Sequence, residues 1–241
     1  MRWWDVKIFY GHAVFLHGMI DAGLITMRLR KIKGAEEAVA NSEFCVQNPP
    51  IHKNNWRQYM DSPSAALHIE IGMGKGTFLM QMAELHPHIV YLGIELFPSV
   101  LFRAIQKMEE NPLPNLRFLC VNADTLTEIF GEGEVDRIYL NFSDPWPKAK
   151  HAKRRLTSAA FLERYDHILS ESGCIEFKTD NRGLFDFSLE EIENSKWKLV
   201  ASTYDLHHDP VLSEGNIMTE YEHKFSALNH PICKMIIDRT P

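Results

Sequence analysis

Short apolar runs alternate with amphipathic stretches along most of the chain, and this alternation constrains the fold more than any other feature. Five apolar runs predict strands, at 66–71, 89–96, 116–123, 135–142 and 174–179. The stretches that follow them have helical periodicity, at 77–86, 99–110, 125–130, 158–170 and 184–194. Strands separated by helices of about ten to fifteen residues form βαβ units around a parallel sheet. The tail predicts further strands, at 198–206 and 222–239, with a loop between them.

A glycine-rich turn joins the first predicted strand to the first predicted helix. In "HIEIGMGKGTFL", Gly72, Gly74 and Gly76 form GxGxG. Glycine permits positive φ and lets a ligand approach the backbone closely. A phosphate-binding P-loop would need glycine at position 69 and Ser or Thr at 76, and the dinucleotide fingerprint needs its third glycine one residue later, so both motifs fail. The open readings are a binding turn of another kind and an ordinary tight turn.

Two acids flank this turn. Glu95 ends the second predicted strand, where doubly wound folds place the acid that binds ribose hydroxyls, and Glu70 comes just before the glycines. Two carboxylates repel phosphates and attract a cation. The predicted ligand is therefore a cation that carries a ribose, and S-adenosylmethionine fits, with its sulfonium, amino group and adenosine. Either acid alone is equally consistent with a solvated surface residue.

The stretch "NFSDPWPKAKHAKRRL" combines a fixed acid with a basic cluster. Asp144 follows the fourth predicted strand, at the edge where open α/β sheets bind ligands. Pro145 and Pro147 fix φ and stiffen its loop. Although the chain has a formal net charge of -6, five bases fall within eight residues here: Lys148, Lys150, Lys153, Arg154 and Arg155. The cluster favours an anionic substrate held through phosphate contacts, and the alternative is a solvated charged face.

Cysteine spacing and hydropathy exclude several classes of protein. The four cysteines form no CxxC pair and have no close histidine partner, which excludes the usual zinc patterns and a disulfide framework and suits a reducing, cytoplasmic compartment. The histidines at 207 and 208 predict a loop, so we expect no metal. No run reaches the ~20 apolar residues of a membrane helix, so we expect no membrane partner.

Four segments together resemble the bacterial tRNA (guanine-N7)-methyltransferase family: "HIEIGMGKG", "FSDPWPKAKHAKRRLT", "FKTDNRGLF" and "MTEYEHKF". The resemblance runs from about Met27 to the last predicted strand. It implies an α/β, Rossmann-like class I methyltransferase fold, with a mostly parallel seven-stranded sheet, an antiparallel C-terminal hairpin and helices on both faces. It also implies methyl transfer from S-adenosylmethionine to N7 of a guanosine in the tRNA variable loop.

The resemblance assigns roles to individual residues. Together with the glycine turn, it predicts cofactor contacts from Glu70, Gly72, Gly74, Gly76, Glu95, Asn122 and Asp144. It predicts RNA contacts from Lys148, Lys150, Lys153, Arg154, Arg155, Asp180, Thr219, Glu220, Tyr221 and Glu222. The sequence departs from the family at two positions. Asn122 stands where an acid is common, which leaves Asp124 as a rival adenine contact, and Ala149 stands where a second base usually follows the first.

The chemistry of guanine N7 defines what the catalytic residue must do. N7 has an in-plane lone pair and no proton, so its attack on a sulfonium methyl needs no general base. Positive charge then appears on the purine ring, and we expect the Asp144 carboxylate to stabilise it. Asp180 would accept from the guanine N1 and N2 hydrogens. The target base must leave its stack, so Tyr221 is either a stacking surface for it or a packed tyrosine of a final strand.

The expected organisation is an N-terminal extension over 1–26, a basic segment over 27–64 and a methyltransferase domain over 65–241. The extension is either an additional helix or a product of a start codon upstream of Met27, and we expect the chain to be active without it. Alternative functions keep the cofactor but change the substrate to another RNA, a small molecule or a protein. A catalytically idle RNA-binding protein and an NAD-dependent oxidoreductase are weaker alternatives. Both a monomer and a homodimer are consistent with the sequence.

Overall fold

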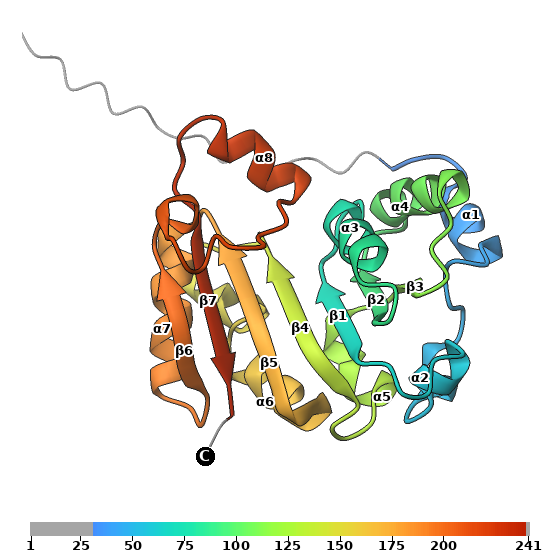
Figure 1. Ribbon diagram of the computed structural model, residues 1–241, viewed down its shortest axis with the longest axis horizontal. Helices are drawn as coiled ribbons and strands as arrows, with labels where there is room; N and C mark the ends of the chain where they lie inside the picture. Colours follow the sequence, from blue (N-terminus) through green and yellow to red (C-terminus); the bar gives the residue numbers. More distant parts are fainter. Residues whose placement is uncertain (1–30, 240–241) are drawn as a thin grey trace, which may run out of the picture.

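The computed structural model describes residues 31–239, and its centre is one seven-stranded sheet with the order β3-β2-β1-β4-β5-β7-β6 (Figure 1). Strands β1 to β5 pair in parallel, and β7 runs antiparallel to both β5 and β6. The predicted mostly parallel sheet with an antiparallel C-terminal hairpin is confirmed. The strands are β1 (Leu67–Ile71), β2 (Val90–Glu95), β3 (Leu116–Cys120), β4 (Val135–Asn141), β5 (Leu169–Thr179), β6 (Lys198–Thr203) and β7 (Cys233–Asp238).

Helices lie on both faces of the sheet, as predicted (Figure 1). Helices α1, α3 and α4 pack on one face, and α2, α5, α6 and α7 contribute to the core on the other. The helices are α1 (Ala35–Asn41), α2 (Trp56–Tyr59), α3 (Thr77–Leu85), α4 (Pro98–Glu110), α5 (Leu126–Ile129), α6 (Ala159–Ile168), α7 (Arg182–Glu193) and α8 (Glu220–Ser226). Short 3-10 turns add η1 (Pro49–His52), η2 (Ala123–Thr125), η3 (Ala149–Arg154) and η4 (Leu206–His208).

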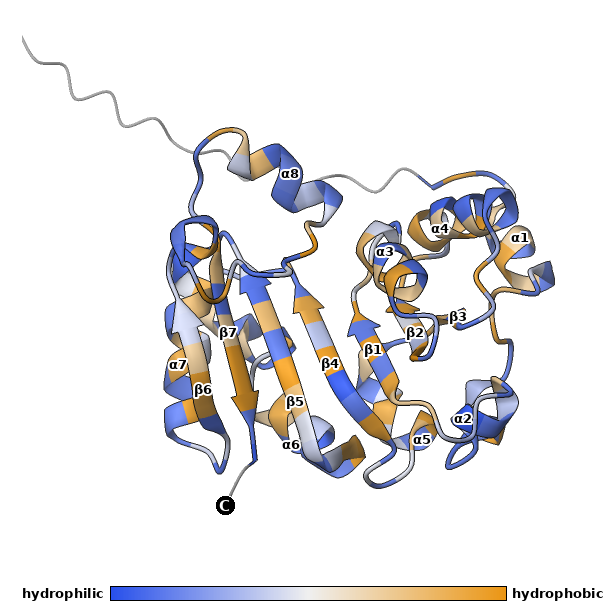
Figure 2. Ribbon diagram, in the orientation of Figure 1, coloured by the Kyte–Doolittle hydropathy of each residue, from blue (hydrophilic) through white to orange (hydrophobic). Residues whose placement is uncertain are grey.

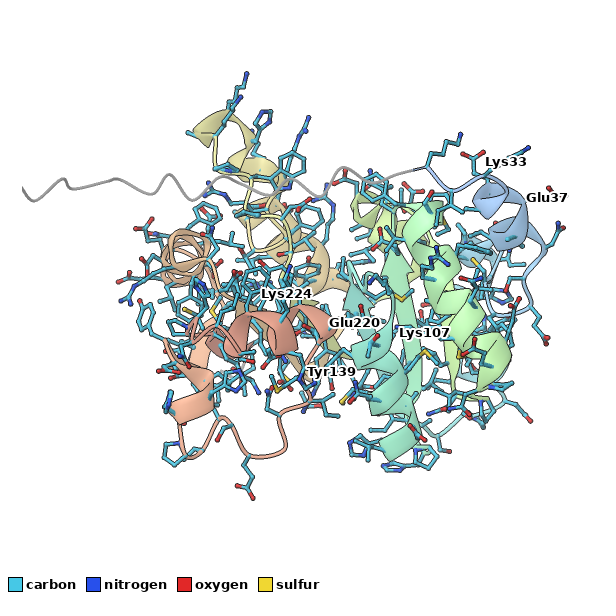
Figure 3. The ribbon with its side chains drawn as sticks, turned by 90° about the horizontal axis from the view of Figure 1, so that it is seen from above. Lys33, Glu37, Lys107, Tyr139, Glu220 and Lys224 are labelled. Carbon is cyan, nitrogen blue, oxygen red and sulfur yellow. The ribbon has the colours of Figure 1, made fainter. Side chains whose placement is uncertain are left out.

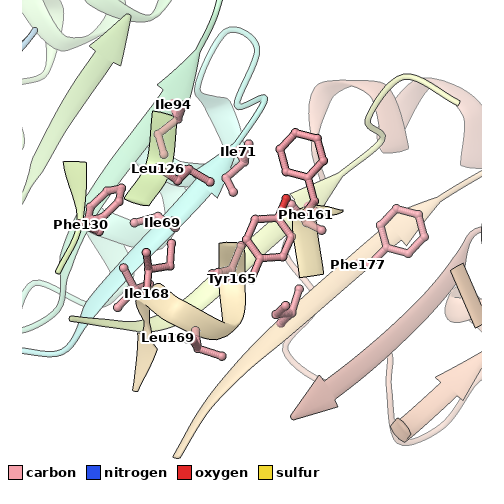
Figure 4. Packing of buried hydrophobic residues seen from close by; sticks show 14 of the residues in the cluster. Ile69, Ile71, Ile94, Leu126, Phe130, Phe161, Tyr165, Ile168, Leu169 and Phe177 are labelled. Carbon is pink, nitrogen blue, oxygen red and sulfur yellow. The ribbon is translucent and has the colours of Figure 1, made fainter. Parts of the chain in front are cut away.

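Side-chain alternation along β1 explains how one strand serves both a core and a site. Leu67, Ile69 and Ile71 face the larger hydrophobic cluster, where Ile69 and Ile71 lie near Phe161 and Tyr165 of α6 (Figure 4). His68 and Glu70 point to the opposite face, because successive strand residues alternate between faces. The apolar stretches of the central strands are visible in the hydropathy colouring (Figure 2).

The prediction of a strand over 222–239 is wrong in its first half. Residues Glu220–Ser226 form α8, and only Cys233–Asp238 forms a strand. A capping box starts the helix: Thr219 Oγ1 accepts from the Glu222 amide at 2.9 Å, and the Glu222 carboxylate accepts from the Thr219 amide at 3.4 Å. The motif was visible in "TEYE", whose Thr-x-x-Glu spacing defines a capping box.

The described part of the predicted basic segment, 31–64, packs onto the same sheet as the rest of the chain. Cys45 forms a parallel bridge with Phe118 of β3. Trp56 is fully buried, and its indole N–H donates to the Ile129 carbonyl at 3.0 Å. The buried Glu134 carboxylate accepts from the Trp56 amide at 3.1 Å. The predicted extension over 1–26 lies outside the described residues, as do 27–30.

Residues 31–239 contain neither a candidate membrane-spanning helix nor a candidate metal site. Within this range, no helix is both long and apolar enough to cross a membrane. In the same described range, no group of three or more His, Cys, Asp and Glu side chains is placed to hold a metal ion.

We expect Gly93→Ala to destabilise the protein, because β2 has no room for a methyl group at this position. A Cβ there would lie 2.1 Å from Met73 Sδ, 3.0 Å from Leu79 Cδ2 and 3.2 Å from Phe118 Cδ1. Overpacking of this kind costs about 1–3 kcal/mol, measurable by urea unfolding. The matched control is Gly183→Ala in α7, where the nearest atom is 3.5 Å away. Equal stabilities of the two variants would contradict the packing shown.

Candidate active site at the carboxyl edge of the sheet

The glycine turn lies between β1 and α3 and has an open outer side. Gly72, Gly74 and Gly76 have φ of 76°, 60° and 72°, in the left-handed region that residues with a Cβ rarely adopt. A Cβ at Gly72 or Gly74 would meet nothing within 4 Å, whereas one at Gly76 would lie 3.2 Å from Ala104 Cβ. Gly76 therefore permits close packing of α3 against α4, and the first two glycines leave the turn accessible to a ligand.

Glu95 is tied to this turn by backbone hydrogen bonds. One carboxylate oxygen accepts from the Gly74 amide at 3.1 Å, and the other accepts from the Phe97 amide at 2.9 Å. The side chain is buried, and burial raises the pKa of Glu95 despite these bonds. The negative charge of Asp144 raises this pKa further.

Glu70 carries an unsatisfied buried oxygen at the same edge. Its Oε1 accepts from Asn141 Nδ2 at 2.8 Å, whereas its buried Oε2 has no hydrogen-bond partner. Burial raises the pKa of Glu70 to about 8, although the Asn141 bond and the Lys178 charge act in the opposite direction. Buried polar atoms are almost always paired in native proteins. The unpaired oxygen therefore fits a donor from a bound ligand, and a cationic one best.

Asp144 lies in a loop with unusual backbone angles. Phe142 and Trp146 have φ of 53° and 42°, although neither is glycine. The Phe142 amide donates to the Lys178 carbonyl at 2.8 Å, which holds the start of the loop on β5. The Asp144 side chain is exposed. Strained backbone of this kind persists where the surrounding structure fixes it, commonly at functional sites.

Asn122 and its rival Asp124 are held in different ways. Asn122 follows β3, and its Oδ1 accepts from the Asp124 amide at 3.0 Å while its Nδ2 donates to Asp124 Oδ2 at 3.2 Å. Asp124 also forms an ion pair with Arg164 of α6 at 3.2 Å. The Asp124 carboxylate is therefore already engaged on both oxygens. Asn122 stands beyond the end of β3, the strand next to the one that carries Glu95.

A buried ion pair docks α8 over the end of β5. Lys178 Nζ lies 2.7 Å from Glu222 Oε2, and Glu222 is fully buried. Lys178 also donates to Asn216 Oδ1 at 3.1 Å and to the Ile217 carbonyl at 2.9 Å. Burial lowers the pKa of Lys178, and the adjacent Glu222 carboxylate opposes this. Glu222, a predicted RNA contact, thus faces the sheet and is covered in this structure.

Glu220 connects α8 to the glycine turn and the helices beside it. Its carboxylate accepts from Lys75 Nζ at 2.9 Å, Lys107 Nζ at 2.7 Å and Thr77 Oγ1 at 2.6 Å. Partial burial raises its pKa, but these hydrogen bonds outweigh it and bring the pKa to about 2. Glu220 and Lys107 lie next to each other in the view from above (Figure 3). Sequence reasoning missed Lys75 and Lys107, and only the "K" of "GMGKG" hinted at a basic partner.

Tyr221 and Asp180, two of the predicted RNA contacts, lie together. The Tyr221 hydroxyl donates to Asp180 Oδ2 at 3.0 Å. The Tyr221 ring stacks on Phe225 with centroids 4.2 Å apart and lies 4.9 Å from the Phe142 ring. Tyr221 belongs to α8 and its side chain is 41% exposed, so the alternative of a packed tyrosine in a final strand is wrong. Thr219 precedes it as the helix cap.

The basic cluster divides into exposed and engaged residues. Lys148, Lys150, Lys153 and Arg154 are exposed on and beside η3. Arg155 is half-buried, and its guanidinium donates to the carbonyls of Pro145 and Trp146 instead. The structure therefore brings the predicted cofactor residues, Asp144 and a cationic surface to one edge of the sheet.

Comparison with known proteins identifies the family. The family described as "Putative methyltransferase" matches residues 64–235. The tRNA (guanine-N(7)-)-methyltransferase of Lachnoclostridium phytofermentans is 52% identical over 88% of this chain and 99% of its own length. The enzyme of the same name from Bacillus subtilis is 46% identical over 88% and 99%. The chain belongs to the tRNA (guanine-N7)-methyltransferase family.

Solved structures show the fold of this methyltransferase independently. The 16S rRNA methyltransferase KamB superposes with a TM-score of 0.58 at 13% identity, over 76% of this chain and 92% of that one. An antibiotic-related methyltransferase gives 0.56 at 17% identity, with the same coverage. Identities this low establish the fold alone, and the fold is the expected class I methyltransferase sheet.

The buried Glu70 should make the stability of this methyltransferase depend on pH. Its pKa is about 8 in the native state and near the ordinary carboxyl value when unfolded, so the native state binds more protons between these values. Stability then falls as the pH rises from about 5 to 8, with a limiting slope of about 1.4 kcal/mol per pH unit for one proton. We expect Glu70→Gln to gain stability relative to wild type over this range, measured by urea unfolding.

The control for this pH series is the exposed Glu132→Gln. Its difference in stability from wild type should stay constant with pH. A Glu70→Gln difference that is equally constant would contradict the raised pKa.

Proposed function

We propose that this chain transfers a methyl group from S-adenosylmethionine to N7 of a guanosine in the variable loop of tRNA. The observation that carries the proposal is the set of three carboxylates at the open glycine turn, next to an exposed basic surface, in a chain of this family. A cationic cofactor and an anionic substrate would each meet the opposite charge. Because tRNA is made and used in the cytoplasm, we propose that location as well, and the free cysteines agree with it.

The residues at the turn fit S-adenosylmethionine. The unpaired Glu70 oxygen offers an acceptor for its amino group, and the side of the turn at Gly72 and Gly74 is free of side chains. Glu95 is oriented by two backbone amides and would accept from the ribose hydroxyls. Asn122, beyond the end of β3 and next to the strand that carries Glu95, would pair with the adenine, whereas Asp124 is held by the ion pair with Arg164. When bound, the cofactor supplies an electrophilic methyl group on a cationic sulfur.

The protein's part in the reaction is electrostatic and positional. Guanine N7 needs no base to remove a proton, so Asp144 acts as a fixed negative charge beside the ring as the ring becomes cationic. Its stiff loop keeps this charge in place without reorganisation. Asp180 would accept from the guanine N1 and N2 hydrogens, and the Tyr221 hydroxyl fixes one of its oxygens. We assign Tyr221, with Phe142 and Phe225, to the wall beside the extruded base.

The exposed bases beside η3 would bind the tRNA backbone. Lys148, Lys150, Lys153 and Arg154 present positive charge next to the Asp144 loop, and phosphate contacts of this kind contribute affinity without reading sequence. Glu220 and Glu222 hold α8 in place through Lys75, Lys107 and Lys178 rather than facing RNA in this conformation. We therefore propose that both act by placing Tyr221.

Incubation with labelled S-adenosylmethionine and unmodified tRNA, followed by nucleoside analysis, tests the proposed function. We expect label in 7-methylguanosine, at a variable-loop position. Label in another nucleoside, or transfer only to a small molecule or protein, would overturn the substrate assignment. Calorimetry with S-adenosylmethionine and with NAD tests the cofactor separately, and binding of NAD alone would overturn the methyltransferase reading of the site.

Asp144→Asn should lower kcat by roughly 100-fold or more, because it keeps the shape of the side chain and removes the stabilising charge. The Kd for tRNA should change little, since Asp144 contributes no attraction to phosphates. The control is Asp61→Asn, an exposed aspartate just before β1 at the opposite edge of the sheet. A near-normal kcat in Asp144→Asn would remove the carboxylate from the mechanism.

Replacing Lys150, Lys153 and Arg154 together by Ala should weaken tRNA binding and flatten its salt dependence. Each lost phosphate contact lowers the slope of log K against log salt by about 0.7–0.9. Binding titrations at four salt concentrations measure the slope. Lys198→Ala, on the edge strand β6, should keep the wild-type slope. An unchanged slope in the triple variant would make the basic surface a solvated face.

A further inference from the structure

Arg155 is half-buried and hydrogen-bonds to backbone carbonyls of the Asp144 loop, whereas its neighbour Arg154 is exposed and meets the same loop through the Trp146 ring, 5.0 Å from the ring centre. Arg155 Nε donates to the Pro145 carbonyl at 3.0 Å, and one terminal nitrogen donates to the Trp146 carbonyl at 3.1 Å. The guanidinium carbon lies 4.2 Å from the centre of the Phe187 ring, which belongs to α7. The side chain is thus held between a helix and a loop, while Lys150 and Lys153 are exposed to solvent.

The two carbonyls that Arg155 binds belong to the loop that presents Asp144. Pro145 directly follows Asp144, and Trp146 has a φ of 42°, in the left-handed region. A non-glycine residue in this region is strained and persists only when its surroundings hold it. The planar fork of an arginine matches two successive acceptors, a geometry that a single lysine ammonium does not reproduce.

We infer that Arg155 is a positioning residue, which fixes the Asp144 loop against Phe187 and does not serve as a phosphate ligand. The inference rests on the proposed function for its kinetic consequence, but the loop geometry on which it stands is independent of the substrate. It separates Arg155 from Lys148, Lys150, Lys153 and Arg154, with which sequence proximity groups it. Within residues 31–239, no side chain hydrogen-bonds to the Asp144 carboxylate, so its position depends on how Arg155 holds the backbone of the loop.

Arg155→Lys tests the inference, because it keeps the positive charge and removes the fork. A residue that only binds phosphate tolerates this change, whereas one that must donate to the Pro145 and Trp146 carbonyls together does not. We expect kcat for tRNA methylation to fall about 10- to 100-fold, the scale of a displacement of about 1 Å at a catalytic group. The Kd for tRNA and the slope of log K against log salt should match wild type. In Lys150→Ala, by contrast, the Kd should rise and the slope should flatten.

Trp146 provides a readout that does not need activity. Release of the loop should increase acrylamide quenching of Trp146 fluorescence in Arg155→Lys, with no substrate or cofactor present. The same measurement in Trp146→Phe, with and without the Arg155 change, subtracts the other tryptophans. Phe187→Leu keeps Arg155 but removes the ring beneath it, so it should shift quenching and kcat in the same direction by a smaller factor. The matched control is Arg103→Lys, at an exposed arginine of α4 whose guanidinium donates to Gln106 Oε1 at 2.8 Å and lies 5.9 Å from the centre of the Phe102 ring.

The outcomes separate this inference from the proposed function. Wild-type quenching in Arg155→Lys, or a normal kcat, overturns the positioning role. A weaker tRNA affinity with a flatter salt slope in Arg155→Lys makes Arg155 a phosphate ligand instead. If wild-type protein fails to methylate tRNA while Arg155→Lys still shows increased Trp146 quenching, the proposed function fails and the positioning role of Arg155 stands. Thermal unfolding of each variant confirms that it is folded.

Discussion

The parallel pairing of β2, β1, β4 and β5 is the constraint on which the site depends. Ile71 lies opposite Ile94 and Asn141 lies opposite Lys178, so these strands end at the same edge. Parallel strands in a doubly wound sheet bind ligands outside their carboxyl ends. The glycine turn after β1, Glu95 at the end of β2 and the Asp144 loop after β4 therefore converge without any of them being close in sequence.

Charge at this edge is arranged in two opposite zones. Glu70 and Glu95 are buried carboxylates whose raised pKa values show that ionising them is costly without a partner. A cationic cofactor relieves that cost, and an anionic one increases it, so burial itself selects the ligand's charge. On the other side of Asp144, the exposed bases next to η3 present the opposite sign. Under the proposed function, a cationic methyl donor and an anionic RNA would meet at the boundary between these zones.

Helix α8 is held over this edge of the sheet by one buried ion pair and two half-exposed ones. The Lys178–Glu222 pair is fully desolvated, so loss of either partner would leave an uncompensated buried charge. The Glu220 contacts with Lys75 and Lys107 are half-exposed, and solvent weakens pairs of that kind. The first pair therefore anchors the helix, and the second adjusts its contact with the glycine turn. Tyr221, between the two glutamates, is placed by both.

Local patterns in the sequence determined the strands, most of the helices, the glycine turn and the stiff loop at Asp144. Hydrophobic periodicity, glycine and proline act within a few residues, so their consequences are readable in isolation. The capping box of Thr219 and Glu222 is equally local, and it starts a helix where the apolar residues that follow predicted a strand. Only the tertiary structure decided that Glu222 pairs with Lys178, 44 residues away, and Glu220 with Lys75, 145 residues away. Tertiary packing also directs the Arg155 guanidinium to the carbonyls of Pro145 and Trp146 instead of to solvent. Such contacts depend on how distant elements pack, and no pattern of neighbouring residues in the sequence predicts them.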